Sequence, residues 1–295
     1  MSKATTANAQ NAGSNGPVLV TGGTGKTGRR VVDRLIARGR SVRVGSRSGT
    51  PAFDWADDST WARALEGVTS AYLAYAPDLS APGALDTLRA FTAEAVAAGV
   101  RRLVLISDRG EAASEQAERI VADAGAEWTV VRCAWFHQNF DEGEFAGMVR
   151  SGVIALPAGA VAEPFVDADD IADVAVAALV EDGHHGQVYE VTGPESLTFN
   201  EVAQILTQAS GHAVRYQAVS MPAFVAGLRA EGAPEQLAGL LEHLLGELLD
   251  GRNASLGDGV QRALGRSPRR FAEYARRAAQ AGGFASMAGQ EVARG

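Results

Sequence analysis

The sequence has little cysteine, little lysine and no long apolar run. Its one cysteine in 295 residues, Cys133, cannot form a disulfide within the chain. A single thiol is typical of a reducing compartment, and we expect a cytoplasmic protein. No apolar stretch approaches the roughly 20 residues that a membrane-spanning helix requires. These absences exclude a disulfide-stabilised scaffold and argue against a membrane partner.

The charge balance argues against nucleic-acid binding. The formal net charge is −8, and the acidic residues are scattered rather than grouped. A nucleic-acid-binding protein normally presents a basic face, and none is apparent here. The chain has 25 arginines but only two lysines, Lys3 and Lys26. A mechanism that requires a lysine at any other position is therefore excluded. Because the sequence argues against both nucleic acid and a membrane, we expect a small molecule as the partner.

Strand and helix patterns alternate through the first half of the chain. Residues 1–16 carry almost nothing to bury, so we expect a disordered leader and no secretory signal. Beyond them, apolar runs of strand length precede segments with helical spacing. This alternation predicts an α/β fold with a parallel sheet covered on both faces. The expected strands are 18–20, 41–45, 70–74, 103–106 and 129–132, and the expected helices are 26–38, 60–65, 84–98, 112–124 and 136–149.

The pattern changes after residue 149, where helices predominate. Seven leucines between 237 and 249 form one apolar stripe, which fits core packing, a lid over the substrate or the face of a homodimer. We therefore expect a dinucleotide-binding core at 17–150, a substrate-binding region at 151–282 interleaved with it, and a flexible tail at 283–295. The expected strands here are 152–156, 164–166 and 187–191, and the expected helices are 171–180, 199–209, 222–229, 235–250 and 268–280.

A glycine-rich segment follows the first strand and precedes the first helix. Gly22 permits a tight turn, Gly25 lets the backbone approach a pyrophosphate, and Gly28 permits close packing of helix on strand. The helix N-terminus then offers amide groups and a partial positive charge to the phosphates. This context predicts dinucleotide binding rather than a structural turn. The expected cofactor-binding residues here are Gly22, Thr24, Gly25, Lys26, Thr27 and Gly28.

The end of the second strand predicts which dinucleotide is bound. An NAD site places a carboxylate there to hold the ribose 2′-hydroxyl, whereas this chain has Ser46, Arg47 and Ser48. A guanidinium can pair with a 2′-phosphate, and two hydroxyls can add hydrogen-bond donors. We therefore expect NADPH, although Arg47 could also be an ordinary exposed loop arginine.

These segments together resemble the NmrA-like branch of the atypical short-chain dehydrogenases. They are most similar to the ergot-alkaloid reductases, which are the agroclavine and festuclavine dehydrogenases and their bacterial relatives. The likeness covers roughly residues 17–215 and implies a Rossmann-type doubly wound sheet with a smaller, mostly helical C-terminal substrate region. It also implies NADPH and the reduction of a C=N or similar bond. The similar segments are residues 21–27, 45–48, 53–55, 99–107, 135–140, 164–167, 170–172 and 193–195.

The resemblance adds candidate cofactor-binding residues to those of the glycine loop. In related folds the Asp-Trp segment flanks the adenine, so Asp54 could accept a hydrogen bond from the adenine amino group beside Trp55. Alternatively, Asp54 caps a turn and Trp55 belongs to the core. Tyr75, Ala76 and Pro77 end a strand at the position where the ligand crevice should open, so they could contact the cofactor. Alternatively, they only terminate the strand.

The usual proton donor of short-chain dehydrogenases is absent. Those enzymes use a Tyr-x-x-x-Lys pair, and none of the five tyrosines here has a lysine four residues later. An iminium carbon is already electrophilic, and hydride addition gives a neutral amine without an oxyanion. The absence therefore favours an imine, a quinone or a conjugated acceptor over a plain ketone.

Further candidates follow the later strands of the sheet. We expect Ser107, Asp108 and Asn139 to be catalytic and Phe136, His137 and Gln138 to bind substrate, because ligands meet such sheets at the strand carboxyl ends. Asp108 could also cap a helix, and His137 could be a buried structural residue. No spacing of ligand residues suggests a metal.

Three functions fit these patterns. The first is an NADPH-dependent reductase of an imine, an iminium or a conjugated carbonyl compound, with a role in secondary metabolism. The second is an NADP(H)-sensing regulator that performs no turnover, as the resemblance to NmrA allows. The third is an NADPH:quinone oxidoreductase.

Overall fold

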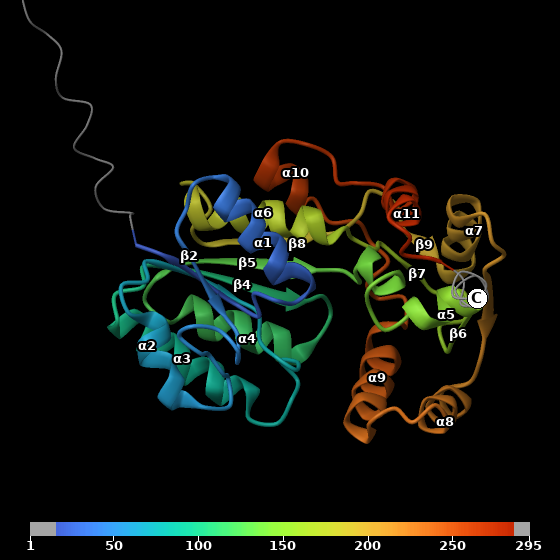
Figure 1. The fold of residues 1–295 in the computed structure, drawn as a ribbon, viewed down its shortest axis with the longest axis horizontal. Helices are drawn as coiled ribbons and strands as arrows, with labels where there is room; N and C mark the ends of the chain where they lie inside the picture. The colour runs from blue at the N-terminus through green and yellow to red at the C-terminus, as the bar shows by residue number, and fades with distance from the viewer. Residues whose placement is uncertain (1–15, 286–295) are drawn as a thin grey trace, which may run out of the picture. The chain divides into compact units, whose positions relative to one another are not determined.

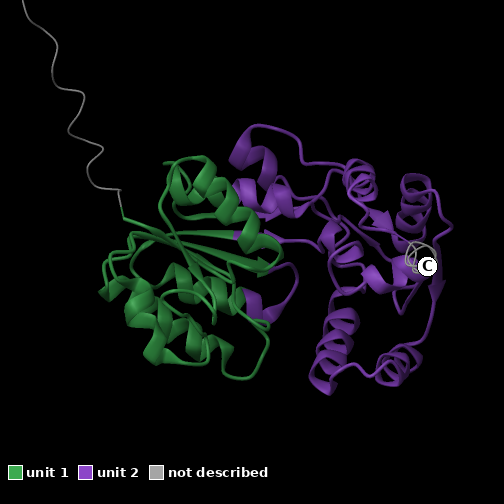
Figure 2. Ribbon diagram, in the orientation of Figure 1, with its two compact units in different colours: residues 1–107, 115–130, 175–187 green, residues 108–114, 131–174, 188–295 purple. Residues whose placement is uncertain are grey.

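The computed structural model describes residues 16–285. The predicted leader, apart from Gly16, and residues 286–295 of the predicted tail lie outside the described residues. The chain divides into two compact units (Figure 2). Unit 1 comprises residues 1–107, 115–130 and 175–187, and unit 2 comprises residues 108–114, 131–174 and 188–295.

A six-stranded sheet confirms the predicted α/β fold (Figure 1). Its strand order is β2-β1-β3-β4-β5-β8, and β1 pairs in parallel with both β2 and β3. The chain leaves β1 for β2 and then returns to β3 on the other side of β1, so the connection reverses there. Ligands of such sheets bind at the carboxyl ends of the strands that flank this reversal. The strands are β1 (Val18–Thr21), β2 (Val42–Gly45), β3 (Ser70–Leu73), β4 (Arg102–Asp108), β5 (Glu127–Cys133) and β8 (Gln187–Val191).

Helices cover both faces of the sheet (Figure 1). The first helix buries Val31, Val32 and Leu35, the residues whose spacing predicted its apolar face. On unit 1, Phe91 contacts Phe53, Trp55 and Trp61 in an aromatic cluster within the core. The helices of this part are α1 (Lys26–Ala37), α2 (Trp61–Leu65), α3 (Ala84–Ala97), α4 (Ala112–Ala122) and α6 (Ala168–Val180), and a 3-10 turn, η1 (Asp58–Thr60), precedes α2.

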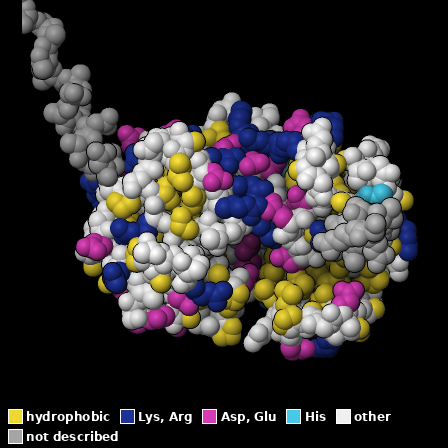
Figure 3. Space-filling view, in the orientation of Figure 1, with side chains coloured by type: hydrophobic (Ala, Val, Ile, Leu, Met, Phe, Trp, Pro, Cys, Tyr) yellow, Lys and Arg dark blue, Asp and Glu magenta, His cyan; other side chains and the backbone are white. Residues whose placement is uncertain are grey.

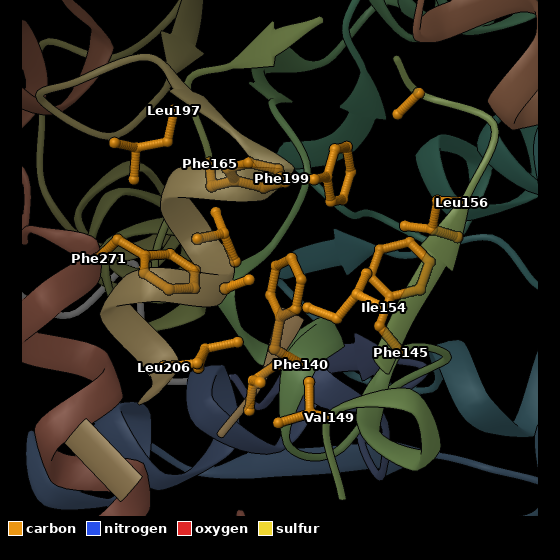
Figure 4. Packing of buried hydrophobic residues seen from close by; sticks show 14 of the residues in the cluster. Phe140, Phe145, Val149, Ile154, Leu156, Phe165, Leu197, Phe199, Leu206 and Phe271 are labelled. Atoms are coloured by element: carbon orange, nitrogen blue, oxygen red, sulfur yellow. The ribbon is translucent and has the colours of Figure 1, made fainter. Parts of the chain in front are cut away.

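Unit 2 is mostly helical and has its own apolar core (Figure 4). Phe140, Phe145, Phe165, Phe199 and Phe271 pack ring against ring at its centre. Two small sheets join it, β10 parallel to β6 and β7 antiparallel to β9. Its elements are η2 (His137–Phe140), α5 (Ala146–Ser151), β6 (Val153–Leu156), β7 (Ala162–Glu163), β9 (Leu197–Thr198), α7 (Phe199–Ser210), β10 (Arg215–Ala218), α8 (Met221–Ala230), α9 (Glu235–Leu248), α10 (Gly259–Leu264) and α11 (Phe271–Gln280).

The leucine stripe of α9 serves mainly as core. Leu241, Leu245 and Leu249 belong to the apolar cluster of unit 2, whereas Leu237 is 38% exposed. Figure 3 shows apolar side chains gathered on the surface over α8 and α9. The stripe therefore packs inward along most of its length, and a homodimer stays a prediction.

Two predicted elements are wrong. The expected helix at 136–149 is a 3-10 turn, η2, and a separate helix, α5, because the polar segment 141–144 with Gly143 interrupts it. The expected strand at 164–166 is instead β7 at 162–163, followed by one isolated bridge between Val166 and Phe136. Pro164 has no amide hydrogen for a ladder, which explains the shift. The periodicity of the sequence did not indicate β9, β10 or α10, each of which has six residues or fewer.

No helix within residues 16–285 combines the length and the apolar character needed to cross a bilayer.

Candidate functional site

The glycine turn brings β1 and α1 into direct backbone contact. Gly22 has φ +61°, a conformation that favours glycine. A Cβ on Gly28 would lie 2.1 Å from the Gly22 carbonyl oxygen, so no side chain fits there. A Cβ on Gly23 would lie 2.9 Å from the Val20 carbonyl oxygen. The turn therefore requires glycine for steric reasons, in agreement with the expected roles.

The N-terminus of α1 suits an anion. Its N-cap is Gly25, no side chain caps it, and the first turn has no acidic residue. The amide groups and the helix dipole at such a terminus attract phosphate. Thr24 and Gly25 are exposed, Lys26 is half-buried, and Thr27 and Gly28 are buried. This arrangement fits the pyrophosphate of a dinucleotide.

Buried hydroxyl groups support this turn from below, and the sequence pattern did not reveal them. The Thr21 hydroxyl donates to the Tyr72 carbonyl at 3.0 Å and accepts from the Ala74 amide at 2.9 Å. The Tyr72 hydroxyl, fully buried, donates to Thr27 Oγ1 at 3.0 Å. These bonds tie the carboxyl ends of β1 and β3 to the first turn of α1.

The predicted 2′-phosphate residues lie on the loop after β2. Arg47 and Ser48 are exposed, and Ser46 is half-buried. The Ser46 carbonyl accepts the amides of Gly49 and Phe53 at 3.0 and 2.9 Å, which shapes the loop. No carboxylate occupies the position where an NAD site carries one.

The predicted adenine residues have structural partners in unit 1. Asp54 Oδ1 accepts the Ala56 amide at 3.0 Å, the contact expected of a turn cap. Trp55 is buried, and its indole N–H donates to the Ala74 carbonyl at 3.1 Å. Tyr75 packs on Trp55 with ring centroids 4.9 Å apart, while Ala76 and Pro77 are exposed. Roles for these residues in cofactor binding stay predictions.

Ser107 is the penultimate residue of β4 and is buried. Its hydroxyl donates to Glu118 Oε1 on α4 at 2.8 Å. Glu118, which the sequence analysis did not single out, is itself buried. The predicted catalytic role of Ser107 stays a prediction.

The remaining predicted residues lie in unit 2. His137, Gln138 and Asn139 are buried in η2, and Phe136 and Asp108 are half-buried. His137 Nε2 lies 2.9 Å from the Phe165 carbonyl oxygen, and its ring packs against Phe271 and Tyr274. The backbone amide of Asp108 donates to Ser114 Oγ at 3.0 Å. Catalytic and substrate-binding roles for these residues stay predictions.

Asp167, fully buried at the start of α6, organises the region around η2. It accepts the Gln138 amide group at 2.9 Å and the Asp169 backbone amide at 2.9 Å, and Arg277 pairs with it. Burial pushes the pKa of this carboxyl upward. The neighbouring His137 ring and the hydrogen bonds from Asp169 and Gln138 outweigh burial and hold the pKa well below its usual range.

The loop after β4 contains a buried arginine that sequence reasoning missed. Arg109 donates to the Asn253 carbonyl at 2.7 Å and the Ser255 carbonyl at 2.8 Å. It also donates to Ser255 Oγ at 2.9 Å and lies 3.3 Å from Glu190. Arg109 therefore fastens this loop to the segment that follows α9.

Glu163, on β7, is the second residue that was missed. It is fully buried, and neither carboxylate oxygen has a hydrogen-bond partner in the described part of the chain. Burial raises the pKa of its carboxyl to about 7, against the lowering effect of Arg109 and with a further rise from Asp250. The only signal in the sequence is an acidic residue beside the apolar run that begins at Pro164.

The structure thus gathers the predicted residues in two groups. The glycine turn, the loop after β2, Trp55, Tyr75 and Ser107 belong to unit 1, and Asp108 and η2 belong to unit 2. Within residues 16–285, no group of three or more His, Cys, Asp or Glu side chains is arranged to hold a metal ion.

Comparisons with known proteins agree with this description. Residues 22–182 match the family described as NAD(P)H-binding. YesF, an uncharacterized oxidoreductase of Bacillus subtilis, is 34% identical over 274 residues, which are 88% of this chain and 94% of that protein. Agroclavine dehydrogenase of Claviceps fusiformis is 31% identical over 280 residues, which are 87% of this chain and 95% of that protein.

A solved structure shares the fold. The triphenylmethane reductase of Citrobacter, complexed with NADP(H), superposes with a TM-score of 0.74 and 22% sequence identity. The match covers 89% of this chain and 99% of that one. It supports the Rossmann-type fold, and the assignment of residues 151–282 as a substrate-binding region stays a prediction.

Proposed function

The chain belongs to the NAD(P)H-binding, NmrA-like family of oxidoreductases, and on that premise we propose that it is an NADPH-dependent reductase of an electron-poor small molecule. The acceptor is an imine, an iminium ion or a conjugated carbonyl compound. The observation that carries the proposal is the uncapped N-terminus of α1, held against β1 by glycines that no other residue can replace.

The choice of NADPH over NADH rests on the loop after β2. Arg47 offers a guanidinium to a 2′-phosphate, and Ser46 and Ser48 offer hydroxyls. An acidic residue there would repel the phosphate, and this chain has none. Thr24, Gly25, Lys26, Thr27 and Gly28 would hold the pyrophosphate at the start of α1.

The proposed class of hydride acceptor follows from the absence of the usual proton-donating residues. Bound NADPH supplies a hydride, but the chain has no Tyr-x-x-x-Lys pair to protonate an alkoxide. Ser107, at the place of the family serine, donates its hydrogen bond to Glu118. Hydride addition to an iminium ion gives a neutral amine, so this reduction needs neither a proton donor nor oxyanion stabilisation. A neutral imine or a conjugated carbonyl compound would instead take its proton from water. The similarity to agroclavine dehydrogenase supports a nitrogen-containing acceptor.

Calorimetric titration tests the cofactor. We expect the wild type to bind NADPH at least about tenfold more tightly than NADH, because a charge-assisted contact contributes about 1.5 kcal/mol or more. Arg47→Ala should remove the difference by weakening only NADPH. Arg89→Ala, an exposed arginine on α3, is the matched control and should leave both affinities unchanged. Equal wild-type affinities for the two dinucleotides would contradict the assignment.

A turnover assay tests the reaction. Purified protein with NADPH is offered cyclic imines, enones and quinones, and loss of absorbance at the nicotinamide band is followed. Turnover of cyclic imines or enones supports the proposal. Activity confined to quinones would instead indicate a quinone oxidoreductase, and tight NADPH binding with no turnover would indicate a regulator.

A further inference from the structure

Glu163 differs from the other buried carboxylates of unit 2. Asp167 accepts hydrogen bonds from Gln138 and from a backbone amide, and Asp170 pairs with Arg266 and Arg269. Glu163 is equally buried, yet neither of its oxygens has a hydrogen-bond partner in the part of the chain that the structure describes. A buried carboxyl group without donors is costly and rare in native proteins, so its retention calls for an explanation.

The arginine that acts on Glu163 does not satisfy this carboxyl. Arg109 lowers the pKa of Glu163, but its guanidinium donates to carbonyl and hydroxyl oxygens of Asn253 and Ser255 and pairs with Glu190. The other charged neighbour, Asp250, is acidic and acts in the opposite direction. Among residues 16–285, the two oxygens of Glu163 therefore remain acceptors without a donor.

Glu163 is fully covered, but an exposed acidic residue acts on it. The backbone of Glu163 pairs with that of Leu197 on β9. Asp250, two residues after the end of α9, raises the pKa of Glu163, and its own side chain is 43% exposed. The route that we infer for a ligand therefore passes beside this segment, which Arg109 fastens through Asn253 and Ser255.

We propose that Glu163 binds the substrate by accepting hydrogen bonds from a cationic nitrogen, as in a protonated imine or the amine formed from it. This inference rests on the proposed function and narrows its substrate class. Two acceptor oxygens without donors match an N–H⁺ group, which brings both the donors and the compensating charge. A quinone has only acceptors and would leave the carboxylate unsatisfied.

The ionisation of Glu163 makes the interaction depend on pH. With a pKa of about 7, the carboxyl is mostly neutral at pH 6 and mostly ionised at pH 8. Arg109 and Asp250 are the charged groups that face it. Affinity for a nitrogen that stays protonated over this range should therefore rise between pH 6 and pH 8.

Calorimetry with a cyclic secondary amine tests the inference without requiring turnover. The probe is tetrahydroisoquinoline, titrated into wild-type protein saturated with NADP⁺. We expect binding at pH 8, at least tenfold weaker binding at pH 6, and at least tenfold weaker binding at pH 8 in Glu163→Gln. Glu231→Gln, which removes an exposed carboxylate at the end of α8, is the matched control and should bind like the wild type.

The outcomes separate this inference from the proposed function. NADPH affinity unchanged in Glu163→Gln shows that the variant is folded. Equal amine affinity in the wild type and Glu163→Gln, or no binding by the wild type, overturns the role of Glu163. Amine binding through Glu163 without reduction of any imine supports the site and contradicts only the proposed reaction. Reduction of imines at the wild-type KM by Glu163→Gln contradicts only the site.

Discussion

The two units use polar groups in different ways. Beneath the glycine turn of unit 1, the supporting side chains are hydroxyls, Thr21, Tyr72 and Thr27, which hold backbone rather than carry charge. Unit 2 instead buries several carboxylates, among them Asp167, Asp170 and Glu163, whereas Glu118 of unit 1 is buried against the Ser107 hydroxyl. The candidate cofactor site is therefore a property of local backbone shape, whereas unit 2 depends on ion pairs between segments far apart in the chain.

Removal of Asp167 should have the largest effect and would break the ion-pair network of unit 2. We expect Asp167→Ala to lower the free energy of unfolding by about 4 kcal/mol, because it leaves the buried Gln138 amide group and the Asp169 backbone amide without an acceptor. Urea denaturation measures this, with Glu242→Ala on the exposed face of α9 as the control. A loss no greater than that of the control would show that the network is not stabilising.

The pH dependence of the same residue follows from its lowered pKa. A carboxyl with a folded pKa below its unfolded value of 3.8 stabilises the fold above that pH. The contribution is lost as the pH falls below about 4 towards the folded pKa. Asp167→Asn should therefore show a shallower loss of stability with acid than the wild type.

Gly28→Ala tests the dependence of unit 1 on backbone shape. The added Cβ would lie 2.1 Å from the Gly22 carbonyl oxygen, so α1 must move away from β1. We expect a destabilisation of about 3 kcal/mol and an NADPH affinity reduced about 100-fold or more. Urea denaturation and calorimetry give the two values. Wild-type affinity in this variant would mean that the close approach of helix and strand is not needed for the cofactor.

Glu163→Gln should raise the free energy of unfolding, whereas Asp167→Ala should lower it. The pKa of the Glu163 carboxyl rises from 4.5 in the unfolded chain to about 7 in the folded protein, so ionisation of this carboxyl opposes folding. Stability is therefore lost as the pH rises from about 4.5 to 7, and it is constant above that range. We expect the variant to be more stable than the wild type by about 3 kcal/mol at pH 8 and nearly equal at pH 4. Thermal or urea unfolding at both values of pH measures the difference, and a less stable variant at pH 8 would contradict the assignment.

Gly239→Ala should have the smallest effect and sharpens the contrast with Gly28. Gly239 lies within α9, and an added Cβ there meets nothing within 4 Å. A helical alanine in place of glycine should raise the free energy of unfolding by about 0.5–1 kcal/mol. The same urea assay applies, and a destabilisation here would indicate that the exposed side of α9 contacts another surface.

Prediction from sequence succeeded where short-range patterns suffice. The strands at 18–20, 70–74 and 103–106 and the helix after Lys26 were confirmed because apolar spacing alone indicates them. The strand, glycine turn and helix are confirmed because their geometry depends on contacts within seven residues, with Gly25 and Gly28 both against the Gly22 carbonyl, whereas their role in binding the cofactor stays a prediction. The helix expected at 136–149 was wrong because the polar segment 141–144 with Gly143 interrupts it, and Phe140 and Phe145 on either side pack on α11 and α7.

The buried polar contacts of unit 2 could not be found in the same way. Arg109 contacts Asn253, which is 144 residues further along the chain, and Arg277 contacts Asp167 from 110 residues away. No local spacing indicates such pairs. Glu163 is conspicuous only because, within residues 16–285, neither of its carboxylate oxygens accepts a hydrogen bond, and that property belongs to the packing of several segments.

The amino-acid sequence by itself determined the alternating α/β order, the glycine turn and the absence of an acid beside Arg47, because each depends on neighbouring residues and on steric limits of the backbone. Only the tertiary structure decided which carboxylates are buried, which arginines pair with them and which acid remains without a donor. The physical reason is that burial and charge compensation depend on segments that meet only when the chain has folded.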